Sequence, residues 1–331
     1  MIEVSIVIPT YNRLKSLNRV LEALTNQTYP LDDFEVIVVS DGSNDGTDEY
    51  LRIFQPPYTF RTIFQSNQGP AAARNNGISQ ARGKLLLFLD DDVLPTPELL
   101  IEHLKVHAQH GENVVAIGPM LSPSDFKMSP WVNWEQEALA KQYRDMDLGK
   151  WEPTARQFYT GNSSLARKHL TEIGGFDVSF TRAEDVELAY RLAVRGLIFI
   201  YNRDAIGFHY AERSFKSWLS TPYLYGRNDV IFTYEKGQTW LLDTIFEEYH
   251  HRNPLIKGLT KLCLDRPKMS SIVYIVLKKV MDVGTLPDSS KLIKFACSGL
   301  FNLRYYQGIA DQLDGRDVFF KRVQNRFNMA V

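Results

Sequence analysis

Three adjacent carboxylates give this sequence its clearest chemical signal. Asp90, Asp91 and Asp92 follow directly on the apolar run at residues 85–89. Carboxylates this close together repel one another unless a proton or a cation neutralises them. If the run ends as an extended strand, alternation points Asp90 and Asp92 one way and Asp91 the other. The pattern predicts a site for a hard divalent cation that holds a diphosphate.

Two further apolar runs also end in polar residues. Residues 4–8 lead into Pro9 and Thr10, and residues 36–39 lead through a serine into Asp41. Uninterrupted apolar runs are typical of strands buried on both faces, as in a parallel sheet with helices on each side. Ligands of such sheets bind beyond the carboxyl ends of the strands. We therefore expect all three polar ends to form one site.

The chain as a whole predicts one α/β catalytic domain followed by helices. Strand and helix patterns alternate through residues 1–215, and residues 216–331 are mostly helical in pattern. We expect the first region to divide into a nucleotide-binding half, residues 1–118, and an acceptor-binding half, residues 119–215. A Ser–His–Asp set, a phosphate-binding Gly–Lys loop and a dinucleotide Gly-x-Gly-x-x-Gly turn are missing from the sequence, which argues against those reaction classes.

Trp131 and Trp134 lie in a segment, residues 119–160, that predicts an insertion over the site. An exposed Trp is costly without a use, so these side chains either stack on a sugar or fix the segment to the rest of the protein. Both interpretations stay open at this point.

The charge of the chain is distributed unevenly. Residues 1–250 carry 24 Lys and Arg against 33 Asp and Glu, whereas residues 251–331 carry 14 against 6. A basic C-terminal region indicates contact with the acidic remainder of the chain, with an anionic membrane or with a phosphorylated substrate. A packed helical surface and a homodimer interface are the alternatives. No nucleic-acid partner is predicted.

The sequence also bears on where the protein works. Strand-like sequence begins at residue 2, and the most apolar late stretch, residues 272–277, is far shorter than the roughly 20 residues of a membrane span. Cys263 and Cys297 lack metal-like spacing. We expect a cytoplasmic protein without a signal peptide, and a place at the inner face of the membrane stays open.

A longer set of motifs resembles the family 2 glycosyltransferases. They occur in order between residues 4 and 210, nearly two thirds of the chain. The motifs are residues 9–13 (PTYNR), 41–43 (DGS), 69–77, 90–92 (DDD), 161–164 (GNSS), 174–177 (GGFD), 184–185 (ED) and His209. The resemblance implies the GT-A fold, a mixed and mostly parallel sheet flanked by helices. It also implies inverting transfer of a sugar from a nucleotide diphosphate, with UDP expected, to an acceptor hydroxyl.

The same resemblance assigns roles to individual residues. Asp185 would be the catalytic base, with Glu184 orienting the base or the acceptor. Asp92, together with His209, would hold Mg²⁺ or Mn²⁺. Residues implied to bind the nucleotide are Pro9, Thr10, Tyr11, Asn12, Arg13, Asp41, Arg74, Asp90 and Asp91. Residues expected in the acceptor and sugar pocket are Gly161, Asn162, Trp131 and Trp134.

The resemblance leaves the sugar, the acceptor and the pathway open. Members of the family act on sugar, lipid-linked and polymeric acceptors, which implies polysaccharide, glycolipid or cell-envelope glycan synthesis. Two other interpretations remain. The chain could bind a nucleotide sugar without turnover. Alternatively, residues 88–94 also fit the acidic signature of haloacid-dehalogenase-type phosphatases, although those usually carry it near the start of the chain.

Overall fold

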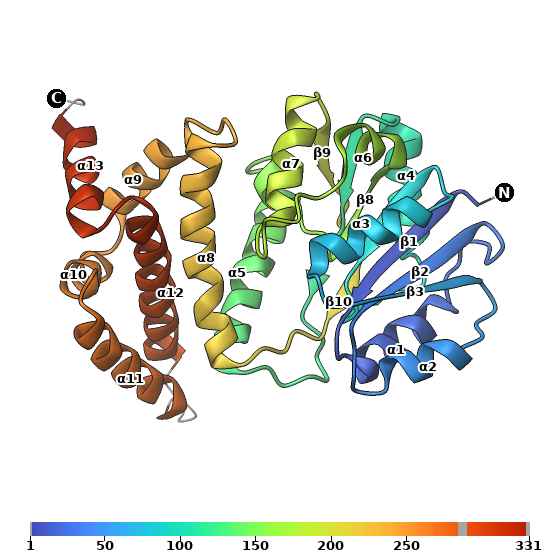
Figure 1. Cartoon of the computed structure of the whole chain (residues 1–331), viewed down its shortest axis with the longest axis horizontal. Helices are drawn as coiled ribbons and strands as arrows, with labels where there is room; N and C mark the ends of the chain where they lie inside the picture. Colours follow the sequence, from blue (N-terminus) through green and yellow to red (C-terminus); the bar gives the residue numbers. More distant parts are fainter. Residues whose placement is uncertain (1, 284–289, 329–331) are drawn as a thin grey trace. The chain divides into compact units, whose positions relative to one another are not determined.

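The computed structural model describes residues 2–283 and 290–328, which form two compact units. The first unit takes in the chain up to Lys127 together with Gln136–Ala211. The second takes in Met128–Glu135 and the described residues from Glu212 onward. Figure 1 shows strands and helices in the first unit and helices in the second. The expected division of the first unit into two halves at residue 118 remains a prediction.

A seven-stranded sheet in the order β3-β2-β1-β4-β8-β6-β9 forms the centre of the first unit. Its strands are β1 (Val4–Thr10), β2 (Phe34–Asp41), β3 (Thr59–Gln65), β4 (Leu85–Leu89), β6 (Val114–Ile117), β8 (Asn162–Ala166) and β9 (Ile198–Tyr201). Strands β3, β2, β1 and β4 are parallel to one another, as are β6 and β9, while β8 is antiparallel to both β4 and β6. The expected mixed and mostly parallel sheet is confirmed.

A small second sheet in the first unit has the order β5-β10-β7. Its strands are β5 (Val93–Pro95), β10 (Gly207–His209) and β7 (Met120–Leu121). Strand β5 begins immediately after the three aspartates, and its Val93 lies opposite His209 in the antiparallel register. This pairing brings a histidine from far along the chain to the acidic end of β4.

Helices cover both faces of the central sheet, which explains why its strands are apolar without alternation. Helices α1 (Leu14–Leu24) and α2 (Thr47–Ile53) share a core cluster with Ile6, Ile8, Val36 and Val38. Helix α3 (Pro70–Gln80) lies on the opposite face, where its Gly77 meets Val7 and Val39. The other helical elements of this unit are α4 (Leu99–His110), η1 (Ala155–Gln157), α6 (Arg167–Ile173) and α7 (Glu184–Val194).

Helix α5 (Pro130–Asp147) contributes its first residues to the second unit and the remainder to the first. The sequence predicted a loop-like insertion here, and the structure instead has a helix of 18 residues.

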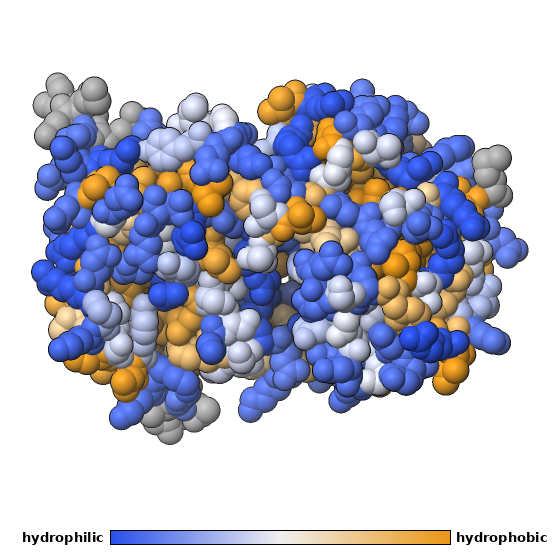
Figure 2. Space-filling model, viewed as in Figure 1, coloured by the Kyte–Doolittle hydropathy of each residue, from blue (hydrophilic) through white to orange (hydrophobic). Residues whose placement is uncertain are grey.

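The face of the molecule in Figure 2 is mostly hydrophilic, with hydrophobic residues in small separate patches.

The second unit is built from the expected C-terminal helices. They are α8 (Phe215–Tyr234), α9 (Leu241–His251), α10 (Pro254–Cys263), α11 (Pro267–Val283), α12 (Ser290–Gln312) and α13 (Arg316–Asn328). Helices α8 and α12 pack closely side by side (Figure 1). A Cβ atom on Gly226 would lie 2.1 Å from the carbonyl oxygen of Tyr305, so this approach requires glycine.

Candidate active site

The carboxyl ends of β1, β2 and β4 meet, as the sequence predicted. Thr10 at the end of β1 donates a hydrogen bond from Oγ1 to Asp91 Oδ2 at 2.6 Å. Asn12, just beyond β1, accepts from the backbone N–H of Asn44 at 2.7 Å and so ties the β1 end to the segment after β2. Asn12 has a φ of 53°, a left-handed conformation that Asn tolerates better than most residues. The three polar ends therefore form one site.

The three aspartates lie in a tight turn and not on an extended strand tip. Strand β4 ends at Leu89, and the N–H of Val93 donates to the carbonyl of Asp90 at 3.1 Å. The predicted simple alternation of the side chains is therefore wrong, because a turn rotates each residue differently. Asp91 points to Thr10, while Asp90 and Asp92 bind two different arginines.

Asp92 lies between two potential cations. Arg13 Nη1 donates to its Oδ2 at 2.6 Å, and His209 Nε2 lies 3.5 Å from its Oδ1. Burial alone would raise the pKa of Asp92, but His209 and Arg13 together lower it below its usual value. Asp92 is therefore held as an anion at neutral pH. Its neighbour Asp91 behaves differently, because burial and the Asp92 charge raise the pKa of Asp91 to about 7.

The donor set around Asp92 fits a divalent ion that takes most of its ligands from a bound diphosphate. The described residues, 2–283 and 290–328, contain no group of three or more His, Cys, Asp or Glu side chains that could hold a metal ion by itself. Asp92 and His209 offer one oxygen and one nitrogen donor. Mg²⁺ commonly uses only one or two carboxylates plus substrate phosphates and water. The buried anionic carboxylate of Asp92 is thus compatible with such an ion.

Arg74 on α3 forms the core of a second charged cluster. Its guanidinium donates from Nη2 to Asp90 Oδ1 and from Nη1 to Glu184 Oε1, both at 2.9 Å. The Arg74 side chain is only 6% exposed. This arginine therefore links the aspartate turn to the start of α7, where Asp185 follows Glu184.

Asp185 is a carboxyl group poised to exchange a proton near neutral pH. Burial, followed by the neighbouring charge of Glu184, raises the pKa of Asp185 to about 7 despite the opposing effect of Arg74. The residue before them, Ala183, has a φ of 57°, which is uncommon for a residue with a Cβ. A strained backbone thus precedes the two acids at the first turn of α7.

Asp41 is buried at the end of β2 and supports the loop before α3. Its Oδ1 accepts from the N–H of Gln68 at 2.8 Å, and its Oδ2 accepts from the N–H of Gly69 at 2.8 Å. The side chain of Gln65 donates to the same carboxylate. Tyr11 lies next to this region with 49% of its surface exposed. Base recognition by Asp41 remains a prediction.

Asn162 is fully occupied by structural hydrogen bonds. Its Nδ2 donates to the carbonyls of Pro119 and Ala205, and its Oδ1 lies 2.9 Å from His103 Nε2. Gly161 accepts from the N–H of Asp90 at 3.3 Å and so touches the aspartate turn directly. The role of both residues in the acceptor and sugar pocket stays a prediction. The contacts of Asn162 indicate that it supports the structure next to the site.

Several site neighbours have no motif in the sequence. His103 and His107 form a buried chain with Ser164, whose Oγ lies 2.9 Å from His103 Nδ1 and 2.8 Å from His107 Nε2. The sequence signal for this pairing is the spacing of four residues between the two histidines. Gln136 of α5 lies against His209, and the sequence carries no sign of that contact because 73 residues separate them.

Trp131 and Trp134 belong to the second unit. Both pack against its core cluster around Trp218, and Trp131 Nε1 donates to the carbonyl of Arg213 at 3.0 Å. Trp134 packs edge-on against the ring of Trp218. This packing accounts for both side chains in the described structure, and their sugar-binding role remains a prediction.

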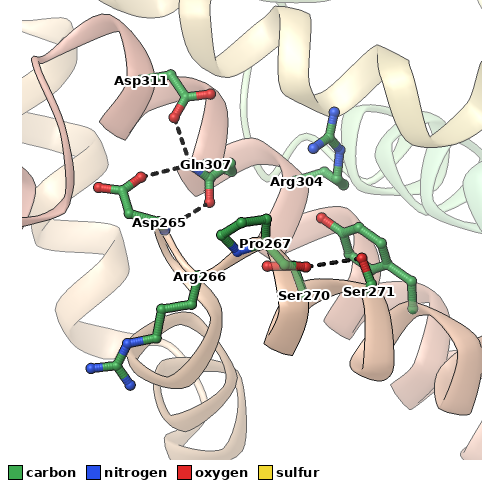
Figure 3. A pocket seen from close by; sticks show the side chains of 9 residues that line it. Asp265, Arg266, Pro267, Ser270, Ser271, Arg304, Gln307 and Asp311 are labelled. Carbon is green, nitrogen blue, oxygen red and sulfur yellow. Dashed lines mark hydrogen bonds between the residues drawn. The ribbon is translucent and has the colours of Figure 1, made fainter.

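A hollow of about 240 Å³ lies within the second unit, near the start of α11 (Figure 3). Two of its carboxylates are already bound, since Gln307 Nε2 donates to Asp265 Oδ1 at 3.0 Å and to Asp311 Oδ1 at 2.6 Å. Figure 3 shows these three side chains pointing toward one another. Through Gln307, Asp265 holds the loop between α10 and α11 to α12, so we place the candidate active site in the first unit.

Comparison with known proteins identifies the family of the chain. The sequence model for glycosyl transferase family 2 matches residues 5–174. The validoxylamine A glucosyltransferase of Streptomyces hygroscopicus subsp. jinggangensis is 33% identical over 61% of this chain. The match covers 54% of that protein, so the chain spans about half the length of this curated relative.

Solved structures of low sequence identity share the fold. S. aureus TarS 1-349 in complex with UDP matches 94% of this chain and 91% of its own, with 17% identity and a TM-score of 0.56. The mannosyltransferase PcManGT from Pyrobaculum calidifontis, in complex with GDP-Man and Mn²⁺, matches 91% of this chain and 85% of its own, with 19% identity and a TM-score of 0.58.

Proposed function

This chain belongs to glycosyl transferase family 2, and from that membership we propose that it moves a sugar from a nucleotide diphosphate to an acceptor hydroxyl with inversion at the anomeric carbon. The observation that carries the proposal is a pair of carboxylates, one in the turn after β4 and one in the first turn of α7, whose pKa values are shifted in opposite directions. Asp92 is held as an anion, while Asp185 has a pKa of about 7. Family membership removes the phosphatase alternative.

Asp185 is the base in this proposal. It takes the proton of the acceptor hydroxyl as that oxygen forms its bond to the anomeric carbon and the bond from that carbon to the diphosphate breaks. A base with a pKa near 7 is half ionised at neutral pH and still basic enough to accept the proton. Glu184, fixed by Arg74, orients the base or the acceptor.

Asp92 and His209 are the proposed ligands of a Mg²⁺ or Mn²⁺ ion. When bound, such an ion stabilises the negative charge that develops on the leaving diphosphate. Arg13 neutralises Asp92 in the structure described here, at 2.6 Å. With 36% of its side chain exposed, Arg13 has room to move from the carboxylate toward a phosphate.

The remaining residues of the strand ends are proposed to hold the nucleotide. The segment Pro9, Thr10, Tyr11, Asn12 and Arg13 would contact base and ribose, and Asp41 would accept an N–H of the base. UDP is the expected carrier; one structural relative was solved with UDP and another with GDP-Man, so the experiment includes both. A sugar-, lipid-linked or polymeric acceptor is part of the proposal, for polysaccharide, glycolipid or cell-envelope glycan synthesis.

Thermal unfolding with nucleotide diphosphates tests the site directly. We expect one nucleotide to raise the melting temperature of the wild type in a Mn²⁺-dependent way, and Asp92→Ala to lose the metal-dependent part. Absence of a shift with every nucleotide contradicts the transferase proposal. Metal-dependent binding without sugar transfer, across a broad acceptor panel, would instead favour a binding protein without turnover.

We also propose that the second unit touches an anionic membrane through the outer face of α11. Ile272, Ile275 and Val276 are 54%, 58% and 53% exposed there, although the opposite face of the same helix packs in the core. Lys268 and Lys279 flank this apolar stripe and form no ion pair with any described residue. An apolar stripe bordered by lysines suits binding to the surface of anionic lipid.

Liposome sedimentation with and without anionic lipid tests the membrane proposal. We expect Ile275→Asp to weaken binding and Ile53→Asp, which removes a still more exposed apolar residue from α2, to leave it unchanged. Wild type that stays in the supernatant with anionic lipid contradicts the proposal. Light scattering that finds a dimer lost in Ile275→Asp would assign the stripe to a second copy. In the described residues, a helix with the length and hydropathy of a membrane span is not found.

A further inference from the structure

Gln136 is a buried amide whose position next to His209 is not used by the proposed reaction. Only 6% of Gln136 is exposed, and its Nε2 lies 3.2 Å from His209 Nδ1. The other end of the amide, Oε1, is buried and has no hydrogen-bond partner among the described residues. Among the described residues, the histidine ring is therefore the only hydrogen-bond partner of this amide.

This contact decides which ring nitrogen of a neutral histidine carries the proton. If the NH₂ group faces Nδ1, that nitrogen accepts, and the proton lies on Nε2, directed at Asp92 Oδ1 3.5 Å away. If the amide is reversed, Oε1 accepts a proton from Nδ1 and Nε2 presents a lone pair toward Asp92. A metal ligand needs that lone pair.

We propose that Gln136 is a positioning residue that sets the tautomer of His209. The inference rests on the proposed function, because it concerns the nitrogen that would join Asp92 in holding the ion. Without metal, the NH₂ group donates to Nδ1, and His209 Nε2–H faces Asp92. With metal and nucleotide bound, a reversed amide would accept the proton of Nδ1 and leave the lone pair of Nε2 for the ion.

Glutamine suits this position because it is both a donor and an acceptor. No described group holds the far end of the amide, so neither orientation is locked. Gln136→Glu can only accept, and would hold the proton on Nδ1 at all times. Gln136→Met has nearly the same size and makes neither hydrogen bond.

Nitrogen NMR on histidine-labelled protein at pH 8 tests the tautomer without any metal. We expect the His209 proton on Nε2 in the wild type and on Nδ1 in Gln136→Glu. The same tautomer in both proteins would overturn the inference. This result does not depend on nucleotide binding or on activity, so it decides the inference even if the proposed function fails.

Mn²⁺ affinity in the presence of UDP, measured by electron paramagnetic resonance, provides the second readout. Second-shell partners of metal-binding histidines typically contribute about 10- to 100-fold in affinity, so we expect Gln136→Met to weaken Mn²⁺ binding about tenfold. In a His209→Ala background the same substitution should have no further effect. An equal loss in both backgrounds would show that Gln136 acts on the fold and not through His209. Melting temperatures of all variants serve as the folding control.

Discussion

Two arginine–carboxylate clusters lie at the strand ends of the first unit, and they differ in exposure and in charge state. In one, Arg13 is 36% exposed and pairs with Asp92, whose pKa is lowered. In the other, Arg74 is 6% exposed and holds Glu184 next to Asp185, whose pKa is raised to about 7. Asp92 and Asp185 are thus the same residue type in the same unit of the protein.

The difference shows that the partner, and not the residue type, sets the chemistry of a carboxylate. Asp92 accepts a hydrogen bond from Arg13 and lies 3.5 Å from His209 Nε2, and both neighbours lower its pKa, so it is an anion available to a cation. Asp185 lies beside the acid Glu184, and the nearby Arg74 donates its hydrogen bonds to Asp90 and Glu184 and not to Asp185. One cluster is therefore suited to charge stabilisation and the other to proton transfer.

The largest expected effect comes from removing the base. Asp185→Asn should lower the rate of sugar transfer by about 10²- to 10⁴-fold, the usual contribution of a general base. The Michaelis constant for the donor should change little, because Asp185 touches the acceptor side. Steady-state kinetics with wild type and variant measure this directly, and near-normal transfer by the variant would disprove the base assignment.

The same variant should unfold less readily than wild type at neutral pH. A pKa raised from 3.8 to about 7 means that the folded protein binds this proton more tightly than the unfolded chain. Stability therefore falls as pH rises between about 4 and 7, and Asn cannot ionise. We expect a higher melting temperature for Asp185→Asn at pH 7.5 and similar melting temperatures near pH 4.

The free energy of unfolding should fall by different amounts when the two arginines are replaced. Arg74→Met leaves the buried Glu184 and the partly exposed Asp90 without their cation and should cost about 3–5 kcal/mol of the free energy of unfolding. Arg13→Met removes a partner that is 36% exposed from Asp92, which keeps His209 nearby, and should cost less than Arg74→Met. Urea unfolding of both variants gives the two values, and equal losses would contradict the comparison.

The smallest effect concerns pH. The rate of transfer should rise about tenfold per pH unit below 7 and level off above it, because Asp185 must be ionised to accept a proton. Glu184, Arg74 and Asp90 surround this group. Asp91→Asn serves as the control, since Asp91 has a similar pKa but binds Thr10 and is not the base.

Much of the first unit was predictable because its signals are local. The apolar runs of β1, β2 and β4 end at polar residues, and parallel strands place those ends together. Arg74 could be placed on a helix begun by Pro70 for the same reason. The turn of the aspartates was not predictable, since it depends on pairing between Val93 and His209.

The helix at residues 130–147 shows the limit of pattern reading. Its first turns pack in the second unit and its later turns in the first, so no single apolar stripe runs along it. The sequence therefore predicts an insertion around Trp131 and Trp134 and carries no signal for the position of Gln136. Contacts with residues 73 or more positions away determine what these side chains do.

The shared helix α5 also constrains how the protein can be made and cut. Residues 128–135 lie in the middle of the chain, yet their unit is completed only by helices at its C-terminal end. A fragment ending after residue 215 would keep Trp134 and lose its partners Trp218 and Phe301. During synthesis, the ribosome releases these tryptophans long before the helices that cover them. A working fragment of the α/β unit would need polar replacements at both tryptophans.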